Sequence, residues 1–322
     1  MKRRDFIQLT AASCLSAVAH SIIPFEANAS NGGVPPQEIT RRAIPFIGSY
    51  LEITITKSLT SEPVDNIITA CFSKLKSSAN EMNYFSSGNL LDQLNKERVL
   101  PLGSLPYPLR ETLIAAECAQ NTDIDGFSIL CGGLTNLWRR ARKQETLPPE
   151  RLLKEALTDT QNSRIHISRE LVLLEGKGTL DLGGIGKGAL CDQAAKFLAK
   201  NGVTEGCVDC GGDMQFIGNT PQLVGIADPD CPTRIAAKVY VPPGGAIATS
   251  GIGETKWHGG GRDMHHLLSL STGYPSSRFK SASIVAPTAL TADMLATVAC
   301  VSPSRHLNGF FHSSSGKLVH YQ

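Results

Sequence analysis

The stretch Asp181-Leu-Gly-Gly-Ile-Gly-Lys-Gly188 predicts a glycine-rich turn that connects a strand to a helix. A strand-like segment at 178–180 precedes the turn, and a helix is predicted over 187–200. Backbone amides at such a turn, together with the positive end of the helix, can face an anion at close range, which favours phosphate. Lys187 adds a positive charge at the same place. The carboxylate of Asp181 could hydrogen-bond a polar ring or a ribose.

Two nucleotide motifs can be compared with this turn. It is not a P-loop, because Asp181 stands where the first glycine should be and Gly188 stands where Ser or Thr should follow the lysine. Gly184-Ile-Gly-Lys-Gly-Ala189 does satisfy the dinucleotide fingerprint G-x-G-x-x-A, with Asp209 about 20 residues later. A tight turn that binds no ligand remains a third interpretation of the same residues.

A second cluster lies on a helix predicted over 289–301. Asp293 and Thr297 are four residues apart, so they present two oxygens on one face of this helix. A carboxylate and a hydroxyl suit Mg²⁺, which takes a few protein oxygens and keeps positions for water and substrate phosphates. Alternatively, Asp293 only complements the helix N-terminus and Thr297 bonds back to its own turn.

The wider pattern predicts an α+β fold of two lobes, with mixed or antiparallel sheets and packed helices. Strands and helices follow one another without a regular βαβ alternation. Alternation of apolar and polar residues indicates a strand at 51–56, and helical spacing follows from residue 61 and again over 109–119. The further strands are predicted at 206–209, 222–227, 236–241, 246–249 and 282–286.

Composition excludes several classes of protein. The chain has 322 residues of which 41% are apolar, so it can bury a full core and is not disordered. The formal net charge is +2, with no basic block beyond the first four residues, which excludes the electrostatic pattern of a nucleic-acid-binding protein. After the N-terminus no apolar run approaches the roughly 18 residues of a membrane helix, so we expect no transmembrane segment in the mature chain.

The N-terminus is predicted to be an export signal. Arg3-Arg4 with Phe6 resembles the twin-arginine signal, and Ala27-Asn-Ala29 is a small-x-small cleavage site, so we expect a signal peptide at 1–29 and a periplasmic location. An ordinary Sec signal and a lipoprotein signal at Cys14 are the alternatives. Residues 30–43 are predicted to be a flexible linker, and 44–322 to be the functional domain.

Most of the eight cysteines after Cys14 lie within apolar patterns, so we expect buried, unreactive side chains. Cys207 and Cys210 have the spacing of a redox dithiol. However, Gly211-Gly212 stands where the helix of such a motif should begin, which disfavours a catalytic dithiol.

The two clusters, taken with other segments in order, resemble the ApbE family of FAD:protein FMN transferases. Weaker landmarks of that family occur at 47–49, 94–95 and 126–138, so the resemblance covers about residues 44–302. The six segments that carry the resemblance are Asp181–Gly188, Val208–Asp213, Val224–Pro229, Ala248–Gly251, His266–Gly273 and Ala286–Thr297.

The resemblance implies an activity and a site. Such a transferase splits FAD at its diphosphate, attaches FMN to a Ser or Thr of a partner flavoprotein and releases AMP. Asp293, Thr297 and the carbonyl of Gly184 would hold Mg²⁺. His266 would be the general base, since an imidazole with an ordinary pKa near ~6.5 can take a proton at neutral pH. The FAD contacts implied in the same way are Asp181, Lys187, Leu268, Ile47, Gly126, Phe127 and Ser128.

Some residues depart from the family pattern, and His265 leaves the choice of histidine open. Ser269 replaces the aspartate usual three residues after the motif histidine, which would slow the transfer or confine it to one partner. A twin-arginine signal on such a domain is similar to maturation factors of the NosX type, which implies a NosR-like or other membrane or periplasmic redox protein as acceptor. The alternatives are a non-catalytic FAD carrier or assembly factor and a dinucleotide-dependent oxidoreductase.

Overall fold

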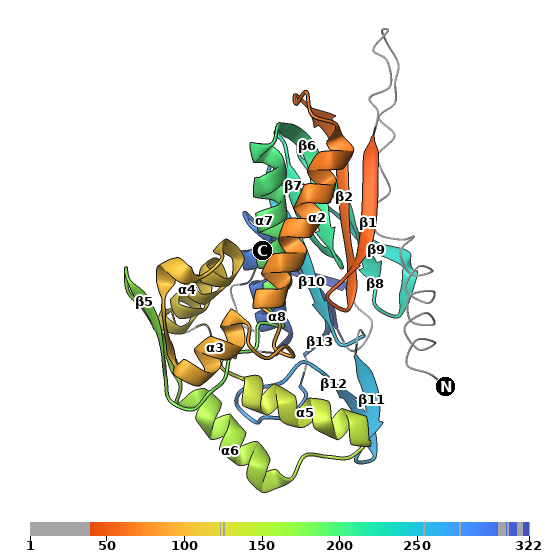
Figure 1. The fold of residues 1–322 in the computed structure, drawn as a ribbon. Coiled ribbons are helices and arrows are strands. Elements are labelled where there is room, and N and C mark those ends of the chain that lie inside the picture. The colour runs from red at the N-terminus through yellow and green to blue at the C-terminus, as the bar shows by residue number, and fades with distance from the viewer. Residues whose placement is uncertain are drawn as a thin grey trace, which may run out of the picture.

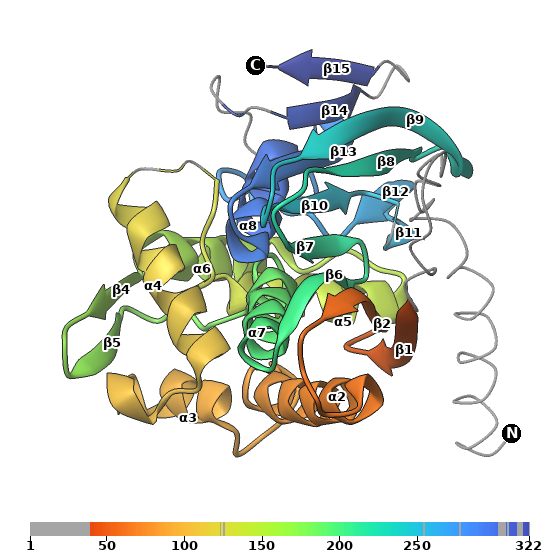
Figure 2. The same ribbon diagram turned by 90° about the horizontal axis from the view of Figure 1, so that it is seen from above.

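A computed structural model describes residues 39–122, 124, 126–253, 255–276, 278–301, 307, 309–313 and 318–321 (Figures 1 and 2). The predicted signal at 1–29 and the predicted linker as far as residue 38 lie outside these residues. The prediction of a linker is wrong for 40–43, because these residues belong to strand β1 (Thr40–Phe46) and pair with β2 (Ser49–Ser58). The guanidinium of Arg41, 2.8 Å from the carboxylate of Glu52, joins the two strands.

An eight-stranded antiparallel sheet forms the larger part of the fold (Figure 2). Along each strand, successive side chains point to opposite faces of the sheet, so two residues that are neighbours in sequence pack on opposite sides. In spatial order the strands after β1 and β2 are β6 (Val203–Cys210), β7 (Asp213–Ile217), β10 (Ala246–Gly251), β13 (Phe279–Ala286), β14 (Gly309–Ser313) and β15 (Leu318–Tyr321). The predicted strands at 51–56, 206–209, 246–249 and 282–286 are confirmed within them.

Both faces of this sheet are covered, which explains its apolar strands. Val208 and Ala248 face the helices α2 (Val64–Glu81), α7 (Gly186–Lys200) and α8 (Ala289–Val301). Cys207 and Ile247, one residue away, face a ribbon of β8 (Gln222–Asp228) and β9 (Cys231–Val241). A sheet packed on both sides carries near-continuous apolar runs where a half-exposed one would alternate.

A mainly helical part lies against one end of the sheet and helices (Figure 1). The sequence predicted only one of its helices, at 109–119. The elements are α3 (Leu90–Glu97), β3 (Val99–Pro101), a 3-10 helix (Leu102–Ser104), α4 (Tyr107–Asn121), α5 (Gly132–Gln144), α6 (Glu150–Gln161), β4 (Arg164–Ile167), β5 (Leu171–Glu175), β11 (Lys256–Gly259) and β12 (Arg262–His265). Strands β3, β5 and β4 form a small sheet, and β11 and β12 form a hairpin.

The helices α7 and α8 touch at Gly188. A Cβ at this position would overlap the carbonyl oxygen of Ala289 and lie 2.7 Å from the Cα of Leu290, so only glycine fits. The carboxylate of Asp192 accepts the amides of Ala289 at 2.8 Å and Leu290 at 3.2 Å, and the side chain of Gln215 also accepts the first of them. These bonds satisfy donors that a helix start leaves without partners, and they fix where α8 begins.

We expect Gly188→Ala to lower the free energy of unfolding by about 1–3 kcal/mol, because an added methyl forces α7 and α8 apart. Gly133→Ala is the control: Gly133 lies in α5, and its added Cβ would meet nothing nearer than Ala156 at 3.9 Å. The control should be neutral or stabilising by up to about 1 kcal/mol. Urea denaturation measures both, and equal stability of the two variants contradicts the tight contact.

Burial raises the pKa of Asp192 to about 6 from its ordinary value of 3.8, against the effect of the amides of α8 that donate to it. The folded protein therefore binds more protons than the unfolded chain between these values, so this contribution to stability is lost as the pH rises from 4 to 6. The stability of the wild type relative to Asp192→Asn should fall between pH 4 and pH 7, by on the order of 3 kcal/mol at most. Urea denaturation at several pH values tests this, and a constant difference would refute it.

Candidate functional site

A cavity of ≈590 Å³ lies where the glycine-rich turn, the start of α5, the end of β10, the segment after β12 and helix α8 meet. Every residue that the family resemblance implied for the site lines its wall. These eleven residues are Ile47, Gly126, Phe127, Ser128, Asp181, Gly184, Lys187, His266, Leu268, Asp293 and Thr297. Residues separated by up to 250 positions in the chain therefore share one cavity.

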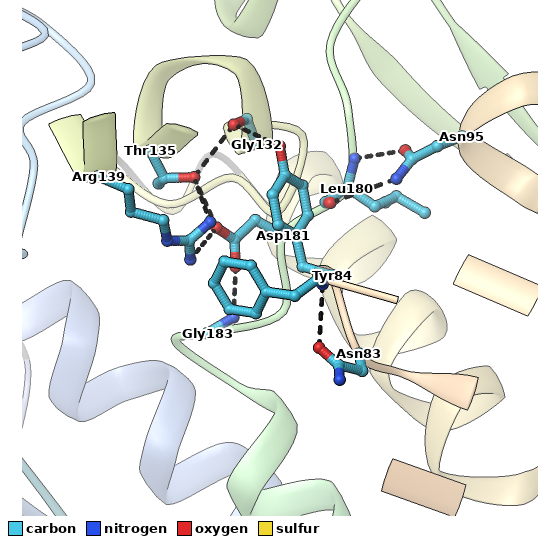
Figure 3. A network of polar contacts seen from close by, with 10 residues as sticks. Asn83, Tyr84, Asn95, Gly132, Thr135, Arg139, Leu180, Asp181 and Gly183 are labelled. Carbon is cyan, nitrogen blue, oxygen red and sulfur yellow. Dashed lines mark hydrogen bonds and ion pairs between the residues drawn. The ribbon is translucent and has the colours of Figure 1, made fainter. Parts of the chain in front are cut away.

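Asp181 holds the glycine-rich turn in place (Figure 3). Its Oδ2 lies 2.6 Å from the hydroxyl of Thr135 and 2.7 Å from Nη2 of Arg139, and its Oδ1 accepts the amide of Gly183 at 3.0 Å. The residue is only 6% exposed. The carboxylate of Asp181 is thus occupied by bonds within the protein, and these bonds connect the turn to α5.

Arg139 is itself held by aromatic rings (Figure 3). The guanidinium carbon lies 4.9 Å from the ring centre of Tyr84 and 4.8 Å from that of Phe85. The hydroxyl of Tyr84 donates to the carbonyl of Gly132 at the start of α5. A cation placed over aromatic faces and paired with a carboxylate keeps one geometry, so this part of the wall is rigid.

Helix α8 presents its oxygens beside the turn. A Cβ on Gly184 would lie 3.0 Å from Cγ2 and 3.2 Å from Oγ1 of Thr297, so the turn passes directly over this side chain. The hydroxyl of Thr297 lies 3.1 Å from that of Ser250, and the buried carboxylate of Asp293 accepts the amide of Gly188 at 3.0 Å. The i and i+4 arrangement predicted for α8 is confirmed.

Asp293 and Thr297 offer oxygen ligands of the kind that Mg²⁺ accepts. No group of three or more His, Cys, Asp and Glu side chains that could hold a metal occurs in the described part of the chain. One carboxylate and one hydroxyl are hard oxygen ligands, and a metal ion held by them would keep positions for other ligands. Mg²⁺ commonly fills such positions with water and substrate phosphates.

Lys187 is anchored at the cavity wall. Its Nζ lies 3.1 Å from Oδ2 of Asp213, whose side chain is 2% exposed. The buried carboxylate fixes the position of the ammonium group at the start of α7. A fixed positive charge beside the glycine-rich turn is suited to an anion that binds there.

The two neighbouring histidines have different surroundings. His266 is exposed and lines the cavity, whereas His265 is partly buried and does not line it. Burial is the main cause that lowers the pKa of His265 to about 4, and the nearby His266 and Lys256 lower it further. The structure therefore favours His266 as the group that can meet a ligand.

Ser269 forms a turn. Its hydroxyl lies 2.7 Å from that of Ser271 and accepts the amide of Ser271, and the residue is buried away from the cavity wall. Ser269 therefore belongs to the loop that carries His266 and Leu268, and it contributes no side chain to the cavity wall.

The dinucleotide fingerprint is not supported by the fold. Asp209, the acidic residue that it requires at a ribose, does not line the cavity. Its carboxylate accepts the hydroxyl of Tyr50 at 2.9 Å and the amide of Gly212 at 2.7 Å. The strand that carries it belongs to an antiparallel sheet, whereas this motif needs a parallel βαβ unit.

Sequence reasoning missed several wall residues. Arg139, Ser250 and Trp257 line the cavity but were given no role, and Trp138 appeared only as a family landmark. The indole of Trp138 donates to the carbonyl of Gly273 at 2.7 Å. Ser250 lies within the segment Ala248–Gly251, and Arg139 lies in the basic run of α5, so the sequence contained weak indications that these two residues belong to the site.

The ApbE family model matches residues 47–318 of the chain. The chain belongs to the ApbE family. Relatives called FAD:protein FMN transferase occur in Treponema pallidum (strain Nichols), 29% identical over 54% of this chain, and in Klebsiella pneumoniae (strain 342), 24% identical over 59% of it. The matched part spans 54% and 61% of those two relatives.

Solved ApbE structures share the fold. The crystal structure of the ApbE protein from Thermotoga maritima is 25% identical, with a TM-score of 0.77 over 88% of this chain and 97% of that one. The apo form of the Pseudomonas stutzeri flavinyl transferase ApbE is 19% identical, with a TM-score of 0.73 over 87% of this chain and 93% of that one. The predicted α+β class and the family resemblance are confirmed.

A double-mutant cycle should detect the Arg139–Asp181 pair. We expect Arg139→Gln to lower the free energy of unfolding by about 2 kcal/mol, because it leaves a buried carboxylate without its cation. Asp181→Asn should cost less in the Arg139→Gln background than in the wild type. Urea denaturation of the four proteins gives the coupling, and simple additivity would exclude an energetically significant pair.

Proposed function

We propose that the protein is an FAD:protein FMN transferase, which transfers FMN from FAD to a Ser or Thr hydroxyl of a partner flavoprotein and releases AMP. The observation that carries the proposal is the convergence on one cavity of all the residues that the ApbE resemblance nominated. Family membership and the names of the relatives support it.

The turn at 181–188 and Lys187 would bind the FAD diphosphate. The turn precedes α7, so its amides and the positive helix end favour phosphate oxygens, and the lysine adds charge. Asp181 would contact the FAD while holding the turn. Leu268, Ile47 and the segment 126–128 would contact the rest of the nucleotide.

His266 is the proposed general base. The acceptor oxygen forms a bond to the phosphorus of the FMN half, and the bond from that phosphorus to the bridging oxygen breaks. The bridging oxygen leaves on AMP, and the imidazole takes the proton of the acceptor hydroxyl. Such a displacement depends mainly on positioning and on neutralisation of charge.

Asp293, Thr297 and the carbonyl of Gly184 would hold Mg²⁺. When bound, Mg²⁺ supplies charge neutralisation at the diphosphate. The chain contributes the rigid placement of these oxygens, through the amide of Gly188 on Asp293 and the hydroxyl of Ser250 on Thr297.

A non-catalytic FAD carrier or assembly factor is the alternative, favoured by the serine at 269 in place of the family aspartate. Such a protein would bind FAD without releasing AMP. A measurement of AMP release therefore separates the transferase from the carrier.

The proposed location is the periplasm, reached by the twin-arginine route, and the proposed acceptor is a NosR-like or other membrane or periplasmic redox protein. The export motif lies outside the described residues. In the described part of the chain, no helix combines the length and the apolar character that a membrane crossing requires.

The test is incubation of the protein with FAD, Mg²⁺ and candidate acceptor flavoproteins. We expect AMP by chromatography and an acceptor heavier by FMN by mass spectrometry, and we expect EDTA to stop both. Intact FAD bound without any AMP from a panel of acceptors would favour the carrier.

His266→Ala should lower the rate of transfer by about 10²–10⁴-fold while FAD still binds, because the acceptor hydroxyl loses its base. His265→Gln is the matched control, because the neighbouring histidine does not line the cavity. AMP release and flavin fluorescence measure rate and binding. Full activity of His266→Ala would reject this role.

A further inference from the structure

A second hollow of ≈500 Å³ adjoins the cavity and has no role in the proposed chemistry so far. It lies between the end of α5 and the β11–β12 hairpin, which are neighbours in Figure 1. Arg142 and Trp257 belong to the walls of both spaces, so the hollow and the cavity are neighbours. The remaining wall residues are Glu145, Lys256, His258, Gly259 and Gly260.

The hairpin wall of this hollow is well fixed. Gly260 and Gly261 form its turn with positive φ angles of 60° and 79°, which favour glycine. A Cβ on Gly260 would lie 2.6 Å from the side chain of Leu147, so the turn is packed against the chain after α5. The hollow is therefore a built surface of the fold.

Basic side chains predominate on the wall. Arg142 and Lys256 carry positive charge, and neither has an ion-pair partner among the described residues. His258 is exposed and lies 3.2 Å from Asp263 across the hairpin. Glu145 is the single acidic residue among those that line the hollow. This balance favours a ligand that carries negative charge.

Trp257 adds a polar group at the junction of the two spaces. Its indole Nε1 is buried and has no acceptor among the residues that the structure describes. Buried donors of this kind are rare and expensive, so a small movement of the Trp257 side chain that brings Nε1 to an acceptor atom of a ligand would relieve the cost. A carbonyl or carboxylate of a bound chain has the required chemistry.

We propose that this hollow, together with Arg142 and Trp257, is the docking site for the acceptor polypeptide, and that it binds acidic side chains flanking the Ser or Thr that receives FMN. The inference rests on the proposed function. An acceptor segment must approach His266 while FAD occupies the cavity, and β12 runs from the hollow directly into His266. The hollow thus opens where the second substrate must enter.

The test uses a fluorescein-labelled peptide with a central Thr flanked by aspartates, and a matched peptide with asparagines in their place. Binding to the full-length protein with FAD present is followed by fluorescence anisotropy. We expect the acidic peptide to bind about tenfold more tightly, a ratio that corresponds to ~1.4 kcal/mol. Lys256→Glu should abolish the difference, whereas Lys76→Glu, an exposed lysine of α2, should preserve it.

Equal binding of the two peptides, or an unchanged preference in Lys256→Glu, overturns the proposal. Competition between the acidic peptide and FAD also overturns it, because the hollow would then belong to the nucleotide site. FAD binding by flavin fluorescence is measured on the same proteins and should be unchanged in Lys256→Glu. Loss of FAD binding in the wild type would contradict the proposed function separately from the peptide result.

Discussion

The contact of α7 with α8 at Gly188 is the constraint on which the cavity depends. Because no side chain separates the helices there, the start of α8 lies against the first turn of α7. Asp192 and Gln215 fix that start by accepting its amides. The helix then places its carboxylate and hydroxyl beside the glycine-rich turn, at a distance that a larger residue in α7 would not permit.

The opposite side of the same turn is held by Asp181. Its carboxylate ties the turn to α5 through Arg139 and Thr135, while Arg139 lies against two aromatic rings. Lys187 is similarly held by the buried Asp213. The charged groups of the wall are thus oriented before a ligand binds, so little reorganisation is required when an anion enters. Preorganisation of this kind is what a phosphoryl transfer demands of a protein.

Two neighbouring spaces, the cavity and the basic hollow, are formed by different elements of the fold. The cavity is built on the glycine-rich turn and α8, whereas the adjoining basic hollow is built on α5 and the β11–β12 hairpin. Arg142 and Trp257 are shared by both walls. Under the proposed function, FAD would occupy the cavity and the acceptor would approach from the hollow without displacing it.

The sequence by itself determined the local elements and the chemical character of the site. The spacing of Asp293 and Thr297 fixed one helix face, and the glycines from 183 to 188 fixed a turn, because these features depend only on neighbours in the chain. It missed β1, where residues 40–43 pair with β2 in a hairpin although they follow a polar, proline-rich segment, and it missed α5, because α5 packs against partners distant in sequence. Only the tertiary structure decided that His266 rather than His265 faces the cavity, that Ser269 forms a turn, and that Arg139 neutralises Asp181. The first and the last of these depend on contacts between distant elements, and the Ser269 turn depends on a local hydrogen bond that no periodicity or spacing encodes.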